Sequence, residues 1–466
     1  MTTTGQVLPA QPFDADLLHE TTLRILERIG IRLEHDGIFA RMVKAGARPG
    51  NGNGEVRLPR EMVAEYLALA PRTVTLAARD GTQTRLTAVS QSVFWTNPGM
   101  YLWSWATGKS AGGRRELMSA DLGRVARLCD GLENVQGVMG MAMADVPARH
   151  RDFVGVRVIA ENSRKHVRAL CFTPRGMEAL SEMKRVFPGN WLSVGFTAHG
   201  PLRWTNLALS IFEKSAGHGI PATINGEPMA GVTGPVTLAG AAAVGNAEIL
   251  SGIVVNQVLE PGRPMIYNLG LAHVFDMRHA TAVTGGPENA LFAGASAAMG
   301  RFYGLPSSSW VSTDSVYDDG QASAEIALAI QSHMAAGVGL IWGMGQLESE
   351  KTISFGRLVI DNEIVGYCRR LLRGMEVTEQ TVAYDVIRDV GIGGSYLEAE
   401  HTLANFRTSL WQPRIFNRKV RESCPERLEQ AGERVAEEML AADAQEKIGP
   451  AEAAELKRIE RAYSRD

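Results

Sequence analysis

The most chemically distinctive stretch of the chain is a polar loop inside the apolar segment 305–347. Residues 313–320 have no apolar period and carry Asp314 and Tyr317, and a segment with helical spacing begins at Gln321. In parallel α/β proteins, ligand-binding groups lie on the loops that follow the strands. We therefore expect Asp314, Tyr317 and Gln321 to face a binding site, with a solvated surface loop as the alternative interpretation.

Other polar residues stand where strands are predicted to end. Glu227, in the stretch NGEPMAG, is suited to neutralise a cation, and His199 is suited to donate a hydrogen bond to a substrate carboxylate. Asn268 ends a further predicted strand. The alternatives are a carboxylate satisfied by backbone amides and an ordinary core or surface histidine. His273 and His279 have a spacing that matches no standard zinc motif, so we expect no metal site.

Aromatic residues gather in the stretch FWTNPGMYLWSW, although the whole chain is only 7% aromatic. It contains Trp95, Tyr101, Trp103 and Trp105. Three further aromatic residues end predicted strands, namely Tyr267, Trp310 and Trp342. Ring faces hold quaternary ammonium ions by cation–π attraction of ~0.5–2 kcal/mol per contact. The pattern favours an aromatic-lined pocket for such a cation, and core packing is the alternative for each ring.

The predicted positions of these residues follow from a repeated sequence pattern in which a strand is followed by a helix. The predicted strands cover residues 135–143, 167–172, 191–197, 221–225, 264–269, 307–312, 338–344 and 394–399. Strands that alternate with helices form a parallel sheet, and eight such units close most economically as a (β/α)8 TIM barrel. A doubly wound sheet is the alternative, but the chain has no Gly-rich dinucleotide fingerprint.

The 466 residues exceed a bare barrel of ~250 residues, so additional segments are expected. We expect a disordered N-terminus at 1–13, an accessory α/β segment at 14–115 packed on the barrel, the barrel itself at 116–420, and a charged helical extension at 421–466. Pro450 divides that extension, which caps the barrel or meets a second subunit. We expect a homo-oligomer.

Composition excludes some classes of function. The net charge of −3 and the pI near 6.4 provide no electrostatic footprint for nucleic acid or an anionic membrane. No segment approaches the ~18 uninterrupted apolar residues of a membrane span, and the N-terminus lacks the features of a signal peptide. Four cysteines lie far apart without a C-x-x-C pair. We expect a cytoplasmic protein that works on a small molecule.

Several long motifs, in order, resemble the trimethylamine methyltransferase family, whose members move methyl groups from methylamines to a corrinoid protein. The motifs include LLHETTLRILERIGIRLEHDGIFARMVKAGA, GVTGPVTLAGAAAVGNAEILSGIVVNQVLEPGRPMIYN, GGPENALFAGASAAMGRFYGLP, TDSVYDDGQASAEIALA and LVIDNEIVGYCRRLLRGMEV. The resemblance covers roughly residues 14–420. It implies a TIM barrel with the methyl donor bound at the C-terminal mouth, where the corrinoid of a partner protein docks.

Two departures from the family pattern bear on the substrate. The archaeal trimethylamine enzymes carry pyrrolysine, whereas this chain has only standard residues. Family members without pyrrolysine use quaternary amines such as glycine betaine, whose nitrogen departs as a neutral amine. Some betaine-using relatives have a histidine where this chain has Trp342. That difference counts against glycine betaine itself.

The resemblance therefore predicts transfer of a methyl group from a betaine-like quaternary amine to the Co(I) of a corrinoid. The chain lacks the Asp-x-His-x-x-Gly loop of corrinoid proteins, so the cobalamin-type cofactor is expected on the partner and not on this chain. The protein has to provide a cation site, orientation and exclusion of water, and no single residue is assigned as catalytic. The alternatives are a trimethylamine:corrinoid methyltransferase and a non-catalytic quaternary-ammonium-binding protein on the same barrel. Another TIM-barrel enzyme class is disfavoured, because the chain has no G-x-S-x-G motif.

Overall fold

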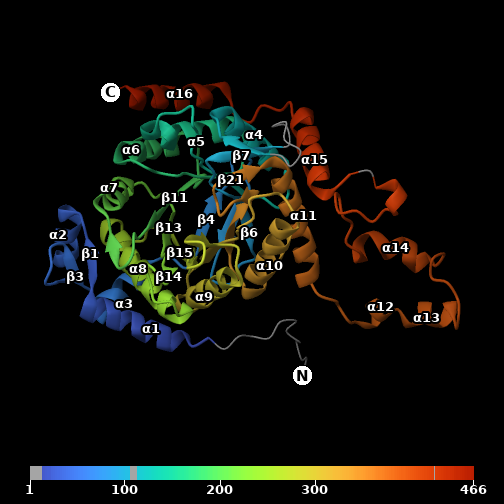
Figure 1. Ribbon diagram of the computed structural model, residues 1–466, viewed down its shortest axis with the longest axis horizontal. Coiled ribbons are helices and arrows are strands. Elements are labelled where there is room, and N and C mark those ends of the chain that lie inside the picture. The colour runs from blue at the N-terminus through green and yellow to red at the C-terminus, as the bar shows by residue number, and fades with distance from the viewer. Residues whose placement is uncertain (1–12, 105–112, 425, 466) are drawn as a thin grey trace.

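Eight parallel strands close into a barrel that helices surround, as Figure 1 shows for the computed structural model of the protein. The structure describes residues 13–104, 113–424 and 426–465. The barrel strands are β6 (Val93–Thr96), β9 (Gly137–Met139), β10 (His166–Arg168), β11 (Leu192–Thr197), β13 (Ala222–Asn225), β15 (Met265–Gly270), β18 (Ser307–Trp310) and β19 (Leu340–Met344). They pair in chain order, and β19 pairs with β6 to close the ring. The predicted (β/α)8 fold class is confirmed.

The predicted eighth strand is wrong. Residues 394–399 contain no strand and lie in turns and irregular backbone. The strand that completes the barrel is β6, which pairs through Phe94 with Ile341 of β19 and through Trp95 with Gly137 of β9. The sequence analysis placed these residues in the accessory segment 14–115 and outside the barrel. The membership of β6 in the barrel depends on pairing with β19, which is ~245 residues away, and a local pattern does not reveal such pairing.

Each barrel strand is followed by a helix on the outer surface. These helices are α4 (Ser119–Gly131), α5 (Arg151–Asn162), α6 (Pro174–Met183), α7 (Asn206–Ser215), α8 (Leu238–Leu259), α9 (Pro287–Tyr303), α10 (Gly320–Ala336) and α11 (Phe355–Leu372). Among the described helices, α8 alone is long and apolar enough to cross a membrane, but 78% of its most apolar window is buried inside the protein. Its apolar side chains face the strands on one side and the N-terminal helices on the other, as in the core of a large domain.

The N-terminal elements pack on the barrel at two places. Helices α1 (Ala15–Arg24) and α3 (Arg60–Leu69) lie on α8. A four-stranded sheet contains β2 (Arg48–Pro49), β3 (Glu55–Arg57), β1 (Ile31–Leu33) and β12 (Arg203–Trp204), and the last of these follows barrel strand β11. A hairpin of β4 (Val74–Ala77) and β5 (Gln83–Leu86) joins the apolar cluster inside the barrel through Val74, Leu76 and Leu86. The hairpin thereby closes the end of the barrel opposite the mouth.

The loops at the C-terminal ends of the strands form two further small sheets that surround the mouth. One contains β14 (Met229–Ala230), β16 (His273–Asp276) and β17 (Thr281–Val283). The other contains β20 (Gln346–Leu347), β21 (Thr352–Ser354), β7 (Tyr101–Ser104) and β8 (Gly113–Glu116). In a barrel of this kind the active site is built from these loops.

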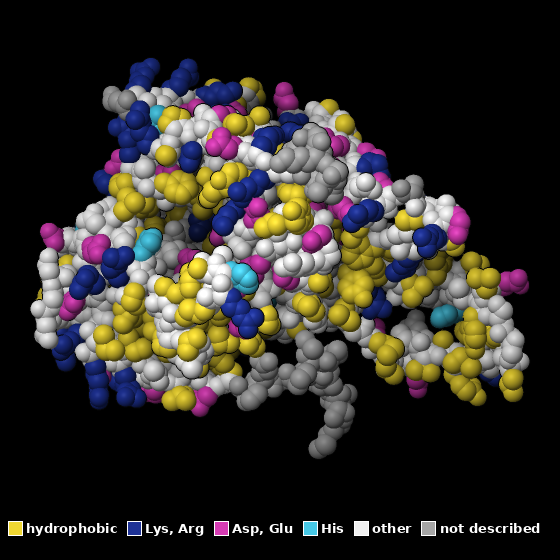
Figure 2. Space-filling view, in the orientation of Figure 1, with side chains coloured by type: hydrophobic (Ala, Val, Ile, Leu, Met, Phe, Trp, Pro, Cys, Tyr) yellow, Lys and Arg dark blue, Asp and Glu magenta, His cyan; other side chains and the backbone are white. Residues whose placement is uncertain are grey.

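After α11 the chain leaves the barrel as an arm, residues 373–424, before it returns (Figure 1). The arm contains α12 (Glu379–Val382), α13 (Tyr384–Val390) and α14 (Glu400–Ser409). Apolar side chains are spread over its surface in Figure 2, and Met375, Ile392 and Leu403 are strongly exposed. The final helices, α15 (Leu428–Ala442) and α16 (Pro450–Ser464), pack against α11 and α6 respectively, so the C-terminal helical extension is confirmed.

Candidate active site at the mouth of the barrel

A cavity of about 350 Å³ opens at the C-terminal ends of the barrel strands. This volume suits a small organic molecule. Its lining comes from the ends of seven barrel strands or the loops after them and from α7, and includes Pro98, Met139, Arg168, Leu170, Cys171, Phe172, Gly195, Phe196, Thr197, His199, Thr205, Leu207, Ala208, Ile211, Asn225, Glu227, Leu271, Trp342 and Glu350. Three of the residues predicted from the sequence line it, namely His199, Glu227 and Trp342.

Two carboxylates face the cavity without a partner. Glu227 follows β13 and Glu350 follows β20, and no hydrogen bond or ion pair satisfies either side chain in the part of the chain that the structure describes. Burial raises the pKa of Glu227 to about 7. Burial, with the nearby Glu227 charge adding to it, raises the pKa of Glu350 to about 8. Both groups are thus destabilised as anions and would be stabilised by a cation.

A third carboxylate, which is close enough to feel the Glu227 charge, is not among the residues that line this cavity. Glu248 on α8 is fully buried, and its Oε1 accepts a hydrogen bond of 2.9 Å from the backbone N–H of Leu202. Burial raises the pKa of Glu248 to about 7, with the Leu202 hydrogen bond opposing this shift and the nearby Glu227 charge adding to it. Negative charge at this end of the cavity is therefore shared among three carboxyl groups, of which two reach the cavity itself.

The loop that carries Glu350 has an unusual backbone. Glu348, Ser349 and Glu350 have φ values of 56, 50 and 79°, in the left-handed region that side chains other than glycine rarely adopt. Hydrogen bonds hold this conformation: the Glu350 N–H donates to Gln346 Oε1 at 2.6 Å, and the Glu350 carbonyl accepts from Asn97 Nδ2 at 2.9 Å. Such local strain persists only where surrounding contacts impose it, and it is concentrated at functional sites.

Asp314, which the sequence analysis expected to contact substrate, supports this loop instead. Its carboxylate accepts hydrogen bonds from the Ser349 hydroxyl at 2.7 Å, from the Thr284 N–H at 2.9 Å and from the Gly285 N–H at 3.0 Å. No acceptor capacity is left facing the cavity, and Asp314 is not among the residues that line it. Gln321 is exposed and donates to Glu325, at 2.9 Å.

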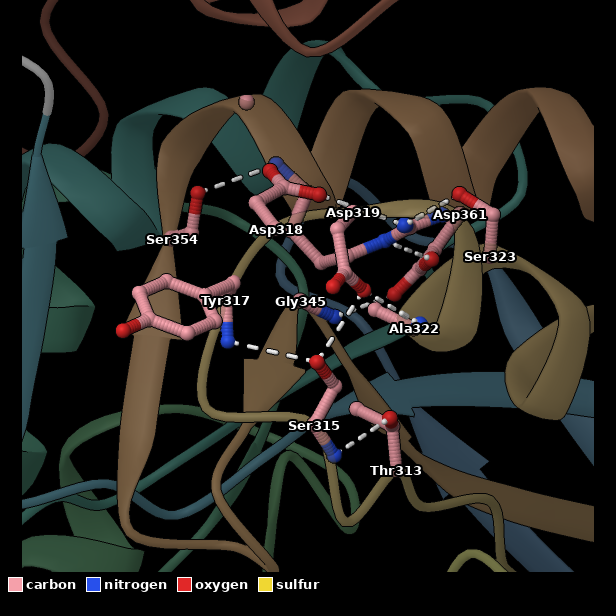
Figure 3. A network of polar contacts seen from close by, with 12 residues as sticks. Thr313, Ser315, Tyr317, Asp318, Asp319, Ala322, Ser323, Gly345, Ser354 and Asp361 are labelled. Atoms are coloured by element: carbon pink, nitrogen blue, oxygen red, sulfur yellow. Dashed lines mark hydrogen bonds and ion pairs between the residues drawn. The ribbon is translucent and has the colours of Figure 1, made fainter. Parts of the chain in front are cut away.

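The loop after β18 continues into a buried network, part of which Figure 3 shows. Asp319 caps α10 by accepting from the Ala322 N–H. Asp318 and Asp361 flank the fully buried Arg357, with N–O distances of 3.3 and 2.7 Å. Asp361 also accepts from the Gly345 N–H at 2.7 Å. The acidic residues of this loop therefore stabilise the architecture around the mouth.

The strand-end tryptophans gather inside the barrel. Trp95, Trp310 and Trp342 belong to one buried cluster, but only Trp342 lines the cavity. Trp95 stacks on His166 with ring centroids 5.2 Å apart. Trp310 lies beside Trp342 in the paired strands β18 and β19. Trp342 therefore borders the cavity, while Trp95 and Trp310 belong to the apolar interior of the barrel.

The remaining predicted residues lie near the cavity without lining it. Tyr101 lies under Arg114, with 4.3 Å between the guanidinium carbon and the ring centroid, and Trp103 meets Tyr317 edge-on at 6.0 Å. Trp105 lies outside the described residues. The described rings Trp95, Tyr101 and Trp103 do not form one box, because a strand and a turn send successive side chains to different faces.

Tyr267 and Asn268 show the same alternation in one strand. The Tyr267 hydroxyl points to α8, where it donates to Asn246 at 2.8 Å. Asn268 points inward and donates to Asn225 Oδ1 at 2.9 Å, and Asn225 donates to Thr197 Oγ1 at 3.0 Å. Asn225 and Thr197 line the cavity, so Asn268 acts on the site by orienting Asn225.

Sequence reasoning missed two charged residues of the cavity. Arg168 ends β10, whose three residues are all buried, and a charged residue within a predicted buried strand is a usable signal. Glu350 lies in the charged stretch ESEK, where nothing in the sequence distinguishes it from a solvated residue. Its position follows only from the backbone of the loop.

Comparisons with known proteins agree with this architecture. The family model described as "Trimethylamine methyltransferase (MTTB)" matches residues 3–462. The chain is 28% identical to the trimethylamine methyltransferase MttB of Desulfitobacterium hafniense strain DSM 10664 / DCB-2, over 87% of this chain and 83% of that protein. It is 30% identical to the glycine betaine methyltransferase of D. hafniense strain Y51, over 89% of each chain. Among solved structures, the monomethylamine methyltransferase MtmB of Methanosarcina barkeri shares the fold with a TM-score of 0.52 and 14% identity, over 92% of this chain and 88% of that one.

Proposed function

Because the chain belongs to the trimethylamine methyltransferase family, we propose that it transfers a methyl group from a betaine-like quaternary amine to the corrinoid of a partner protein. The observation that carries the proposal is the pair of unpartnered carboxylates, Glu227 and Glu350, in a cavity whose wall includes the indole of Trp342. Buried carboxylates without a partner favour a cationic ligand, and an aromatic face favours an alkylated one.

The chemistry of the donor fits these residues. A quaternary nitrogen departs as a neutral amine when a nucleophile takes one of its methyl groups, so the donor itself requires no proton transfer. Glu227 and Glu350 stabilise the positive charge of the bound donor, and that attraction weakens as the methyl group leaves. Their contribution is therefore mainly to binding, while the walls of the cavity orient the donor and exclude water.

The methyl acceptor is expected outside this chain. A Co(I) corrinoid supplies the nucleophile for such a transfer, and a cavity of about 350 Å³ is far smaller than a corrin macrocycle. The cavity therefore suits the donor, and the rim suits contact with a partner, since Phe172 and Leu207 there are 40% and 53% exposed. Apolar side chains on a rim are typical of surfaces that another protein covers.

The test is a methyl-transfer assay with the purified chain and Co(I) cobalamin, or a corrinoid protein encoded beside it. Donors are glycine betaine, longer trimethylammonium carboxylates, choline, tetramethylammonium and trimethylamine. We expect methylcobalamin to form with a quaternary donor and the demethylated amine to appear in equal amount by mass spectrometry. Trimethylamine as the preferred donor would support the tertiary-amine alternative. Tight binding of donors without transfer to any corrinoid would support the non-catalytic alternative.

The proposal includes a cytoplasmic, homo-oligomeric protein. The arm 373–424 carries exposed apolar side chains such as Met375 and Ile392, which a second copy of the chain would cover. Light scattering coupled to size-exclusion chromatography tests this part, and a monomer at micromolar concentration would contradict it.

A further inference from the structure

The cavity contains a buried cation as well as its two carboxylates. Arg168 is only 4% exposed, and its guanidinium carbon lies 5.7 Å from the centroid of the Trp342 ring. Nη1 donates to the carbonyl oxygen of Ala169, whereas the buried Nε has no acceptor. No carboxylate within residues 13–104, 113–424 and 426–465 forms an ion pair with Arg168. A buried charge without a counter-ion is costly, so its retention calls for a role.

The backbone opposite Arg168 leaves room for the guanidinium. A Cβ atom on Gly195 would lie 1.8 Å from Nη2, so the glycine on β11 provides the space that the guanidinium occupies. Burial lowers the pKa of Arg168 to about 10, which leaves the group protonated at neutral pH. A charged, planar donor group is therefore held at the wall of the cavity by the packing of β10 and β11.

The opposite charges of the cavity do not meet. Arg168 lines the same space as Glu227 and Glu350, yet no ion pair in the described chain joins it to either carboxylate. Long side chains that shared one empty pocket would neutralise each other if the barrel allowed them to. The barrel instead holds them on different strands, so the cavity presents one cationic and two anionic side chains that are not paired with one another.

We propose that Arg168 is the residue that binds the carboxylate of the betaine-like methyl donor and thereby determines specificity. This inference rests on the proposed function. The guanidinium fork matches the two oxygens of a carboxylate, and the resulting charge-assisted hydrogen bonds are among the strong ones. Arg168 is then the residue that separates betaines from choline and tetramethylammonium. The sequence analysis assigned this task to His199, which lies exposed at the rim.

The first experiment needs only the unmodified chain. Isothermal titration compares trimethylammonium carboxylates of increasing chain length, each with its uncharged primary amide, and with tetramethylammonium. A carboxylate accepts two charge-assisted hydrogen bonds from a guanidinium, whereas a primary amide offers one uncharged acceptor. We therefore expect the best-fitting acid to bind at least about tenfold more tightly than its amide.

Two substitutions locate that preference. In Arg168→Met the acid is expected to lose its advantage, while the affinities for the amide and for tetramethylammonium remain within about threefold of the unmodified chain. Gly195→Ala displaces the guanidinium without removing its charge and is expected to reduce the same preference. Arg168→Lys keeps the charge but loses the fork, and an intermediate preference is expected. A cooperative thermal transition confirms that each variant folds.

The outcomes separate this inference from the function on which it rests. If tetramethylammonium binds but no acid exceeds its amide, the role of Arg168 is wrong and the proposed cation site stands. If Arg168→Met weakens acid and amide equally, Arg168 is structural and the inference is also wrong. If no quaternary ammonium compound binds at all, both the inference and the proposed function fail.

Discussion

Two groups of charged residues lie at the mouth of this barrel, and they differ in whether other groups of the protein pair their charges. In the network after β18, Arg357 is flanked by Asp318 and Asp361, and Asp314 is saturated by hydrogen bonds from the protein. In the cavity, by contrast, the charged side chains of Arg168, Glu227 and Glu350 have no counter-ion in the described structure. Each group combines buried and half-buried side chains, so burial alone does not distinguish them.

The difference lies in what compensates for the loss of water. Charges that the chain itself pairs contribute to folding, whereas charges that it leaves unpaired reduce stability until a ligand pairs them. The two groups are also connected, because Asp314 accepts a hydrogen bond from Ser349, the neighbour of Glu350. The paired network therefore helps to position Glu350, one of the unpaired carboxylates of the cavity.

The largest effect on stability is expected when the buried cation of the paired network, Arg357, is removed. Arg357→Met leaves Asp318 and Asp361 buried without a cation, which should lower the free energy of unfolding by ~3–5 kcal/mol. Arg168→Met is the matched control, since it removes a buried guanidinium that no carboxylate pairs, and its loss should be smaller by at least ~2 kcal/mol. Urea denaturation of the ligand-free protein measures both. Equal losses would show that the two groups do not differ as described.

The second effect concerns binding and not folding. At pH 9, where both carboxyls are ionised, Glu227→Gln and Glu350→Gln should each weaken the binding of tetramethylammonium by ~2 kcal/mol, or about thirtyfold, because each removes a desolvated charge that faces the ligand. In turnover, KM should rise more than kcat falls, as expected for interactions that are lost when the methyl group leaves.

Glu248→Gln is the control for both carboxylates. Glu248 is buried beside them but does not line the cavity, and glutamine keeps an oxygen for the Leu202 N–H. Its affinity for the cation should change by less than about threefold. If Glu248→Gln reduced the affinity as much as Glu227→Gln does, cation binding would depend on the total negative charge near the cavity and not on direct contact with a carboxylate.

The comparison also shows how far the sequence can predict such a site. The alternation of strands and helices predicts a barrel, and the residues at strand ends predict Glu227, His199 and Trp342 at the cavity. The polar loop at Asp314 and Tyr317 looks equally suited to bind a ligand. Whether a carboxylate is free or already paired depends on groups such as Thr284 and Ser349, which are distant in sequence. Strand patterns contain no such information.

The same limit explains the missed residues. Glu350 reaches the cavity because three consecutive residues adopt positive φ, and a charged stretch of ordinary composition does not predict that backbone. β6 was placed in the accessory segment and not in the barrel, because its partner, β19, lies at the other end of the barrel sequence. Local patterns predict elements, whereas pairing between distant elements decides which side chains meet.

A third effect separates the tryptophans inside the barrel. Trp342→Leu should weaken binding of tetramethylammonium by ~1–2 kcal/mol through loss of one cation–π face. Trp310→Leu should leave that affinity nearly unchanged and lower the thermal stability, because Trp310 packs in the interior cluster without lining the cavity. Titration and thermal unfolding of both variants test this division. A loss of affinity in Trp310→Leu comparable to that in Trp342→Leu would place both rings at the ligand.

The smallest effect is a dependence of binding on pH. The donor nitrogen has no proton to lose, so from the sequence alone we expected turnover to vary little between about pH 6 and pH 9. The cavity supplies different titrating groups, because burial raises the pKa of Glu227 to about 7 and that of Glu350 to about 8. A protonated carboxyl attracts a cation weakly, so the affinity for tetramethylammonium should rise with pH, by roughly fivefold, or about 1 kcal/mol, for each pH unit between about pH 7 and pH 8.5.

Stability of the empty protein should change in the opposite direction. A folded carboxyl whose pKa exceeds its unfolded value of ~4.5 binds a proton that the unfolded chain has lost, so its contribution to stability disappears as pH rises through the folded pKa. The ligand-free Tm should therefore fall between about pH 6 and pH 8.5, while the increase in Tm caused by tetramethylammonium should grow. Glu227→Gln and Glu350→Gln should each flatten both trends. If the double substitution leaves the pH dependence of ligand-induced stabilisation intact, the titrating group lies elsewhere and these carboxylates do not contact the cation.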